Sequence, residues 1–380
     1  MKLKKQCMKL SRDHFDQIPD DLAVDILSRL SGKSLMKLRY VSKFWFSIIR
    51  SQRLIDSFIP RSLKRGSRFL IAFNNCEFVV KKTDMRLFFF TVSDDEGENK
   101  SSPSSLVASL DMTIPSTVDY HYTRGSANDD AKKLTYKYLG YDPIDDQYKA
   151  MCMTVSRRGH HGGDVEHKVL TLGGGRGDVK TLSWRIMEDN TEPYVPYTKG
   201  TCINGIVYYG ATRPNTNGVI VCFDVRFEKI SLMNPPLNIK SWEVGTSLIN
   251  YKGKVAIIHT TPLRDSYEII VWILENVKTH EWSKKTRFFP HSSSDTIDMS
   301  SYSFIGINET REIILAPKLM PRNLEAFYIF YFDLTSQGIR RVRVEGLADD
   351  EEFKRHYGIG NNGSCPVSIS SEHFENITFF

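Results

Sequence analysis

The sequence predicts an α+β protein in two parts, a short helical N-terminal module followed by a large all-β domain. Between residues 15 and 60, apolar residues recur at the three- and four-residue spacing of an amphipathic helix. From residue 68 onward, strand-length runs rich in Val, Ile, Phe and Tyr alternate with Gly, Asn and Asp turns. In this second part, pairs of hairpins recur about every 50 residues, a period typical of four-stranded β-propeller blades.

The composition is that of a soluble globular protein. The 380 residues are 41% hydrophobic and 25% charged. The net charge of +6 is a small difference between 51 basic and 45 acidic residues, so we expect no nucleic-acid partner. No apolar run approaches the roughly 20 residues of a membrane helix, so we expect no membrane partner. The six cysteines form no C-x-x-C pair and follow no secretory signal, which predicts reduced thiols in the nucleus and/or cytoplasm.

Three helices are expected in the N-terminal module. Pro19 suits a helix start, and Asp20 and Asp21 favour the positive end of the helix dipole. Ser34 can cap a second helix after a break at Ser31-Gly32, and a third short segment follows. The predicted organisation is a basic tail (1–14), the helical module (15–60), a linker (61–67) and the β domain (68–380).

The repeats of the β domain are defined by their turns. One type of hairpin turns at Asn204-Gly205, Lys252-Gly253 and Asn308-Glu309. A second type ends an apolar strand at residues 222–225, 273–276 and 331–334. Four units fit between residues 138 and 344, and strands at 69–73 and 87–90 form a fifth, which residues 374–380 close. An irregular β-sandwich is the alternative fold.

Several short motifs occur at fixed spacing in residues 15–51. They are Ile18-Pro19, Ile26-Leu27-Ser28-Arg29-Leu30, Lys33-Ser34-Leu35, Val41-Ser42-Lys43 and Trp45. This pattern closely resembles the F-box. The Pro that the family places after Arg-Leu is replaced by Ser31 here, which removes a rigid backbone angle and can weaken adaptor affinity without changing the fold.

The resemblance implies a partner, the Skp-type adaptor of Skp–cullin–F-box ubiquitin ligases, and through it a cullin. The module also carries more apolar side chains than so short a helical piece can enclose, which is typical of a partner surface. The predicted adaptor-binding residues are Ile18, Pro19, Leu22, Ile26, Leu27, Leu30, Leu35, Val41 and Trp45.

The β domain resembles the F-box-associated domain of plant F-box proteins. The matching segments are residues 68–73, 88–90, 140–143, 147–154, 169–173, 184–185, 274–275, 281–284 and 372–376. The segments occur in the family's order along the chain. The resemblance implies that this domain binds a target protein, and it does not name the target.

No catalytic residue, metal site or cofactor is predicted. The Gly-rich run at residues 173–177 lacks the Lys-Ser/Thr of a P-loop, so we expect a hairpin loop there. His160, His161 and His167 have no Cys or paired acid at a ligand spacing, which favours a polar loop. The acidic residues at 145–146 and 349–352 are expected to be solvated loop charges.

Three functions remain to be weighed. The first is a non-catalytic substrate receptor that binds a target protein for ubiquitination, the second is a small-molecule-binding or enzymatic propeller, and the third is an F-box scaffold acting outside a ligase. The lack of catalytic motifs favours the first.

If the protein is a receptor, loops of the β domain are expected to hold the target, because the strands are occupied with pairing. The candidate loops are residues 157–167, 173–180, 211–218 and 262–267. Their basic excess predicts an acidic or phosphorylated target. The predicted target-binding residues are Arg157, Arg158, His160, Arg176, Arg213 and Arg264.

Overall fold

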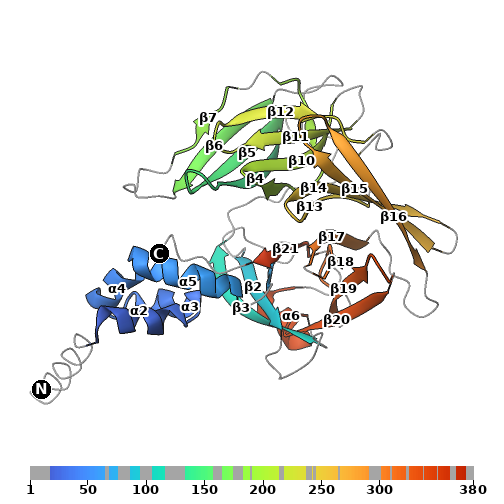
Figure 1. The fold of residues 1–380 in the computed structure, drawn as a ribbon. Coiled ribbons are helices and arrows are strands. Elements are labelled where there is room, and N and C mark those ends of the chain that lie inside the picture. The colour runs from blue at the N-terminus through green and yellow to red at the C-terminus, as the bar shows by residue number, and fades with distance from the viewer. Residues whose placement is uncertain are drawn as a thin grey trace, which may run out of the picture. The chain divides into compact units, whose positions relative to one another are not determined.

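A computed structural model describes most of the chain (Figure 1). The described residues are 18–64, 68–75, 86–94, 105–115, 133–156, 165–173, 183–188, 191–213, 218–236, 242, 245–263, 266–290, 301–308, 310–321, 325–336, 338–348, 350–359 and 365–373.

Four helices form the described part of the N-terminal module, drawn in blue in Figure 1. They are α2 (Asp20–Ser28), α3 (Gly32–Leu38), α4 (Lys43–Ile49) and α5 (Gln52–Lys64). The Ser31 side chain accepts a hydrogen bond from the backbone N–H of Ser34. The sequence had suggested Ser34 as the cap of α3, but the cap is Ser31. The residue that departs from the F-box pattern thus supplies a side-chain acceptor that proline lacks.

Helix α5 is the fourth helix, where the sequence predicted three. Pro60 favoured an end to the helical module, yet α5 continues through it to Lys64. Leu54 and Phe58 lie one turn apart on α5 and are fully buried in the helical core. Burial of two such side chains contributes about 3 to 6 kcal/mol, enough to offset the roughly 3 kcal/mol that an interior proline costs. Residues 61–64, which were assigned to the linker, lie in this helix.

The described residues of the β domain form four sheets. The first sheet consists of β4 (Lys133–Asp142), β5 (Gln147–Ser156), β6 (Val165–Gly173) and β7 (Arg185–Ile186). The second consists of β8 (Val195–Pro196), β9 (Thr201–Ile203), β10 (Ile206–Thr212), β11 (Gly218–Asp224) and β12 (Lys229–Met233). The third consists of β13 (Thr246–Tyr251), β14 (Lys254–Pro262), β15 (Ser266–Asn276) and β16 (Glu281–Pro290).

The fourth sheet has eight strands and joins residues from both ends of the β domain. Its order is β17 (Tyr302–Ile307), β18 (Glu312–Pro317), β19 (Phe327–Asp333), β20 (Ile339–Glu345), β3 (Ser105–Pro115), β2 (Arg86–Asp94), β1 (Arg68–Asn74) and β21 (Val367–His373). Strands β20 and β3 pair in parallel. The predicted fifth unit therefore exists as strands, but it continues the sheet of the fourth unit. The last strand of this sheet is β21, and residues 374–380, predicted to close the ring, lie outside the described residues.

Successive sheets pack face to face through apolar cores. Between the first and second sheets the core includes Met151, Val169, Tyr209 and Phe223. Between the second and third it includes Ile220, Trp242, Ile257 and Leu274. Between the third and fourth it includes Val271, Phe289, Ile313 and Phe332. This serial stacking confirms the propeller-like β domain that the repeat period predicted. It leaves the turns at the sheet ends for other contacts.

A short helix, α6 (Glu351–Tyr357), covers part of the eight-stranded sheet. The sequence predicted solvated loop charges at residues 349–352. Asp350, Glu351 and Glu352 are exposed, but the loop assignment is wrong for Glu351 and Glu352, which lie in α6. The Asp350 side chain caps the helix by accepting from the Phe353 N–H at 2.6 Å, and the two glutamates occupy its first turn. The ring of Tyr357 packs edge-on against Phe88 at 4.9 Å between centroids. Aromatic burial therefore orders this segment into a helix.

Removing β21 should destabilise the β domain. Deletion of residues 367–380 leaves one edge of β1 unpaired. We expect the midpoint of thermal unfolding to fall by about 5 °C or more, which corresponds to roughly 3 kcal/mol for a domain of this size. The matched control is deletion of residues 374–380, which retains β21 and should cause the smaller change. Equal melting of both variants and the intact chain would show that β21 does not hold the sheet.

Candidate functional site

The nine predicted adaptor-binding residues divide by burial. Leu27, Leu35 and Trp45 are buried in the helical core. Ile18 and Leu30 are half-buried and pack against that core. Pro19, Leu22, Ile26 and Val41 are exposed. On α2, Leu22 is 52% exposed and Ile26 43% exposed, one turn apart. The buried residues shape the module from within, and the exposed ones offer the largest surface for direct contact with a partner.

The structure adds three exposed apolar side chains that the sequence did not single out, namely Met36, Tyr40 and Phe46. The Arg39 guanidinium lies over the rings of Tyr40 and Phe46, 5.9 and 5.4 Å from their centroids. Arg50 also lies over Phe46, at 5.4 Å. Aromatic and arginine side chains are the types enriched at interface hot spots. Helices α3 and α4 have two turns each, so residue spacing alone could not identify their exposed face.

Helix α5 is tied to α2 by an ion pair. The Asp25 carboxylate accepts hydrogen bonds from Arg61 at 2.7 Å and from Arg29 at 2.8 Å. The hydrogen bond from Arg61 lowers the pKa of Asp25 more than desolvation raises it, and the hydrogen bond from Arg29 lowers it further. Arg61 also donates to the Ser28 hydroxyl on α2. These contacts hold α5 against α2.

Most of the predicted target-binding residues lie outside the described residues, namely Arg157, Arg158, His160, Arg176 and Arg264. Arg213 is described. It follows β10, is half-buried, and donates from Nη1 to Glu192 at 3.0 Å. His167, expected in a polar loop, instead lies within β6, where it is buried and hydrogen-bonded to the Tyr194 hydroxyl at 2.9 Å. Alternation along β6 turns this histidine into the core.

The turns at one end of the sheets are held by side-chain caps. In each, an Asp or Asn oxygen accepts from a backbone N–H two to four residues later, the Asx geometry of tight turns. The donor N–H groups and their acceptors are Ile144 to Asp142, Phe227 to Asp224, Lys278 to Asn276, Glu312 to Asn308 and Thr335 to Asp333. Asp224, Asn276 and Asp333, which end the second type of hairpin repeat, and Asn308 of the first type are therefore caps.

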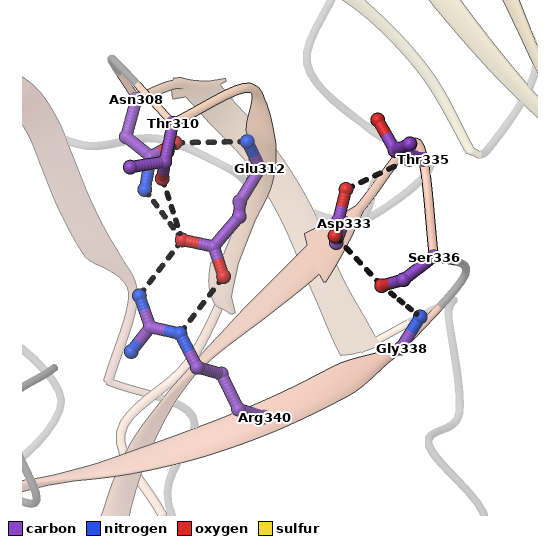
Figure 2. Close-up of polar contacts among 8 residues, drawn as sticks. All are labelled: Asn308, Thr310, Glu312, Asp333, Thr335, Ser336, Gly338 and Arg340. Atoms are coloured by element: carbon purple, nitrogen blue, oxygen red, sulfur yellow. Dashed lines mark hydrogen bonds and ion pairs between the residues drawn. The ribbon is translucent and has the colours of Figure 1, made fainter. Parts of the chain in front are cut away.

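Figure 2 shows two such turns in the fourth sheet. Glu312 accepts from Arg340 through both oxygens, at 2.8 and 2.9 Å, and also from Asn308 at 2.7 Å. These hydrogen bonds, that from Arg340 foremost, lower the pKa of Glu312. The guanidinium of Arg340 stacks 3.8 Å from the ring centroid of Tyr331. Each oxygen of the carboxylate thus has a partner, and the arrangement stiffens the turn.

An ion-pair cluster joins the first and second sheets. The buried Lys149 ammonium donates to Glu228 at 2.7 Å and to the Arg226 carbonyl at 3.3 Å. Arg185 on β7 donates to both oxygens of Glu228. The hydrogen bond from Arg185, and then that from Lys149, lowers the pKa of Glu228. The cluster fastens the turn at residues 225–228 to the neighbouring sheet.

In the described part of the chain, no group of three or more His, Cys, Asp or Glu residues could hold a metal ion. No helix there is long and apolar enough to cross a membrane.

Two known families match this chain. Residues 15–57 match the F-box domain, and residues 115–364, most of the chain, match the F-box associated beta propeller domain. The chain belongs to the F-box proteins with an F-box-associated domain. The resemblances stated from the sequence are thereby confirmed.

This F-box protein has relatives of similar length in Arabidopsis thaliana. It is 42% identical to F-box protein At1g30790, over 97% of this chain and 100% of the relative. It is 40% identical to the putative F-box protein At1g32660, over 93% of this chain and 82% of the relative. It is 32% identical to F-box protein DOR, over 91% and 95% of the two chains.

Replacing Glu228 by Gln should destabilise this F-box protein, because Lys149 would lose its buried counter-charge. We expect a loss of about 1.5 to 3 kcal/mol at neutral pH, the range for a hydrogen bond to a charged group. The pKa of Glu228 is lowered by folding, so its contribution is present above the unfolded value near 4.3 and is lost as pH falls through the folded pKa. The difference between wild type and Glu228→Gln should therefore shrink in acid.

Urea unfolding followed across this pH range measures the effect. The control is Glu166→Gln, because Glu166 pairs with Lys168 at 3.0 Å on an exposed face. A pH-independent difference for Glu228→Gln, or an equal loss in Glu166→Gln, would contradict the role assigned to the cluster.

Proposed function

We propose that this F-box protein is the non-catalytic substrate-recognition subunit of a Skp–cullin–F-box ubiquitin ligase. It docks on the Skp-type adaptor through the helical module and binds a target protein through the β domain for ubiquitination. Membership in the F-box family, whose proteins with associated domains are generally substrate receptors, supports this reading. The observation that carries it is the exposed apolar pair on α2, Leu22 and Ile26.

Physical reasons favour a partner on this surface. Burying an exposed Leu or Ile side chain contributes about 1.5 to 3 kcal/mol. Leu22 and Ile26 lie on one face of a helix that is already anchored by its buried residues and by the Asp25–Arg61 pair. A preformed helix loses little conformational entropy when it binds. The aromatic side chains of Tyr40 and Phe46, with Arg39 between them, supply further anchors.

The acidic residues of the turns favour a binding role over an enzymatic one, because they take part in structural ion pairs and turn caps. Glu312 and Glu228 each hold arginine in structural ion pairs, and Asp224 and Asp333 cap turns. Carboxylates engaged in this way stabilise the scaffold. A receptor and a scaffold outside a ligase are separated by whether a cullin co-purifies with the adaptor complex.

Leu22→Ala combined with Ile26→Ala should weaken binding to purified Skp-type adaptor about 100-fold or more, since two truncated anchors together forfeit at least 2.7 kcal/mol or so. Calorimetry on the full-length protein measures this. Both residues are exposed, so circular dichroism should remain unchanged.

The matched control is Leu139→Ala with Ile186→Ala, which truncates two exposed apolar side chains of the β domain. It should bind adaptor as wild type does. Wild-type affinity in the Leu22/Ile26 variant would show that α2 is not the docking surface.

A further inference from the structure

Two neighbouring turns of the β domain each present a large apolar side chain to solvent. Ile144 lies in the turn between β4 and β5, and Phe227 lies in the turn between β11 and β12. They are 70% and 67% exposed, respectively. Such exposure at a turn tip makes no contribution to the core. A cluster of exposed apolar side chains with charged neighbours is typical of a protein interaction site.

An ion pair and a ring contact make the two turns one surface. Arg226 contacts Asp145 of the other turn, with Nε 3.5 Å from Oδ2. The same guanidinium lies 5.7 Å from the ring centroid of Phe227. We refer to Ile144, Asp145, Asp146, Arg226 and Phe227 as the turn surface.

The turn surface is preformed. Asp142 accepts from the Ile144 N–H at 2.9 Å, and Asp224 accepts from the Phe227 N–H at 2.9 Å. Beneath the second turn, the buried Lys149 binds the Arg226 carbonyl and Glu228. Because these bonds already hold the backbone, a ligand that binds here pays little further ordering entropy.

The charges of the turn surface favour a cation in the ligand. Asp145 and Asp146 are exposed carboxylates. Arg226 is already engaged with Asp145 and Phe227, whereas Lys149 and Arg185 are engaged with Glu228. Asp146 accepts a hydrogen bond from a neutral group, the Tyr141 hydroxyl, at 2.8 Å. The carboxylate of Asp146 is therefore placed to bind a lysine or arginine beside the apolar contacts.

We propose that the turn surface is where the target docks, and that it takes a protein segment in which an aliphatic or aromatic side chain is next to Lys or Arg. The proposal rests on the proposed receptor function and gives it a surface and a ligand chemistry. It differs from the acidic target expected from the sequence. That expectation relied on basic loop residues such as Arg213. Arg213 lies just after the C-terminal end of β10, whereas residues 204–205 precede its N-terminal end. Arg213 is also paired with Glu192.

The test uses full-length protein bound to purified adaptor, with a displayed library of short random peptides as the probe. Wild type should enrich peptides that place an apolar residue next to Lys or Arg. Ile144→Ser combined with Phe227→Ser should reduce that enrichment about tenfold or more, the loss expected from removing two interface anchors. Asp146→Asn should keep the apolar preference and lose the basic one.

The matched control is Ile186→Ser, because Ile186 is 68% exposed but lies on β7, outside the turn surface. It should enrich the same peptides as wild type. Enrichment of acidic peptides, no enrichment at all, or enrichment unchanged in the double variant would overturn the proposal. If Ile186→Ser loses the peptide enrichment and the double variant keeps it, the proposal is also overturned and the site lies near β7.

Adaptor affinity and thermal unfolding of the same variants separate this proposal from the proposed function. The Ile144/Phe227 variant should retain both, so its loss of peptide enrichment reports on the turn surface alone. If Leu22→Ala with Ile26→Ala binds adaptor as wild type does, the docking assignment of the proposed function fails whatever the library shows.

Discussion

Apolar packing between successive sheets is the constraint on which the β domain depends. Alternate side chains of a strand point to opposite faces, and in the second and third sheets both faces are buried against neighbours. Trp242 illustrates how close this packing is. A Cβ added at Gly210 would lie 2.4 Å from its ring, while its Nε1 donates to the Val219 carbonyl at 3.0 Å. A residue that is buried in this way cannot also contact a variable partner.

This commitment divides the chain between stability and recognition. Strands provide burial, whereas turns are free to vary once their backbone is held by an Asp or Asn cap. The caps make the turns rigid without using their outward side chains. Ion pairs such as Lys149–Glu228 and Glu312–Arg340 add a second restraint at the same ends of the sheets. A partner therefore meets a preformed surface, which lowers the entropic cost of binding.

The helical module follows a different logic. Its core is small, and Phe58, Leu27 and Leu35 are among the side chains buried in it. Apolar residues beyond this capacity remain at the surface, because a short helical piece has too little interior for them. The surplus of apolar residues that made the module recognisable in the sequence is thus the physical origin of its exposed Leu22 and Ile26.

Local chemistry carried in the sequence determined much of this protein. The change from helical to strand periodicity, the hairpin repeat and the F-box motifs each depend on residues close together in the chain, so the fold class and family could be predicted. Tertiary structure decided what depends on distant neighbours. Helix α5 continues through Pro60 because Leu54 and Phe58 are buried against residues of α2, α3 and α4. Strand β21 joins β1 from the other end of the chain. His167 is buried because β6 turns it toward Tyr194. The pairing of Arg226 with Asp145 brings together turns about eighty residues apart. Periodicity indicates which face of an element is apolar, but only the packed neighbours determine whether that face is covered. For this reason Leu22 is exposed whereas Leu27, on the same helix, is buried.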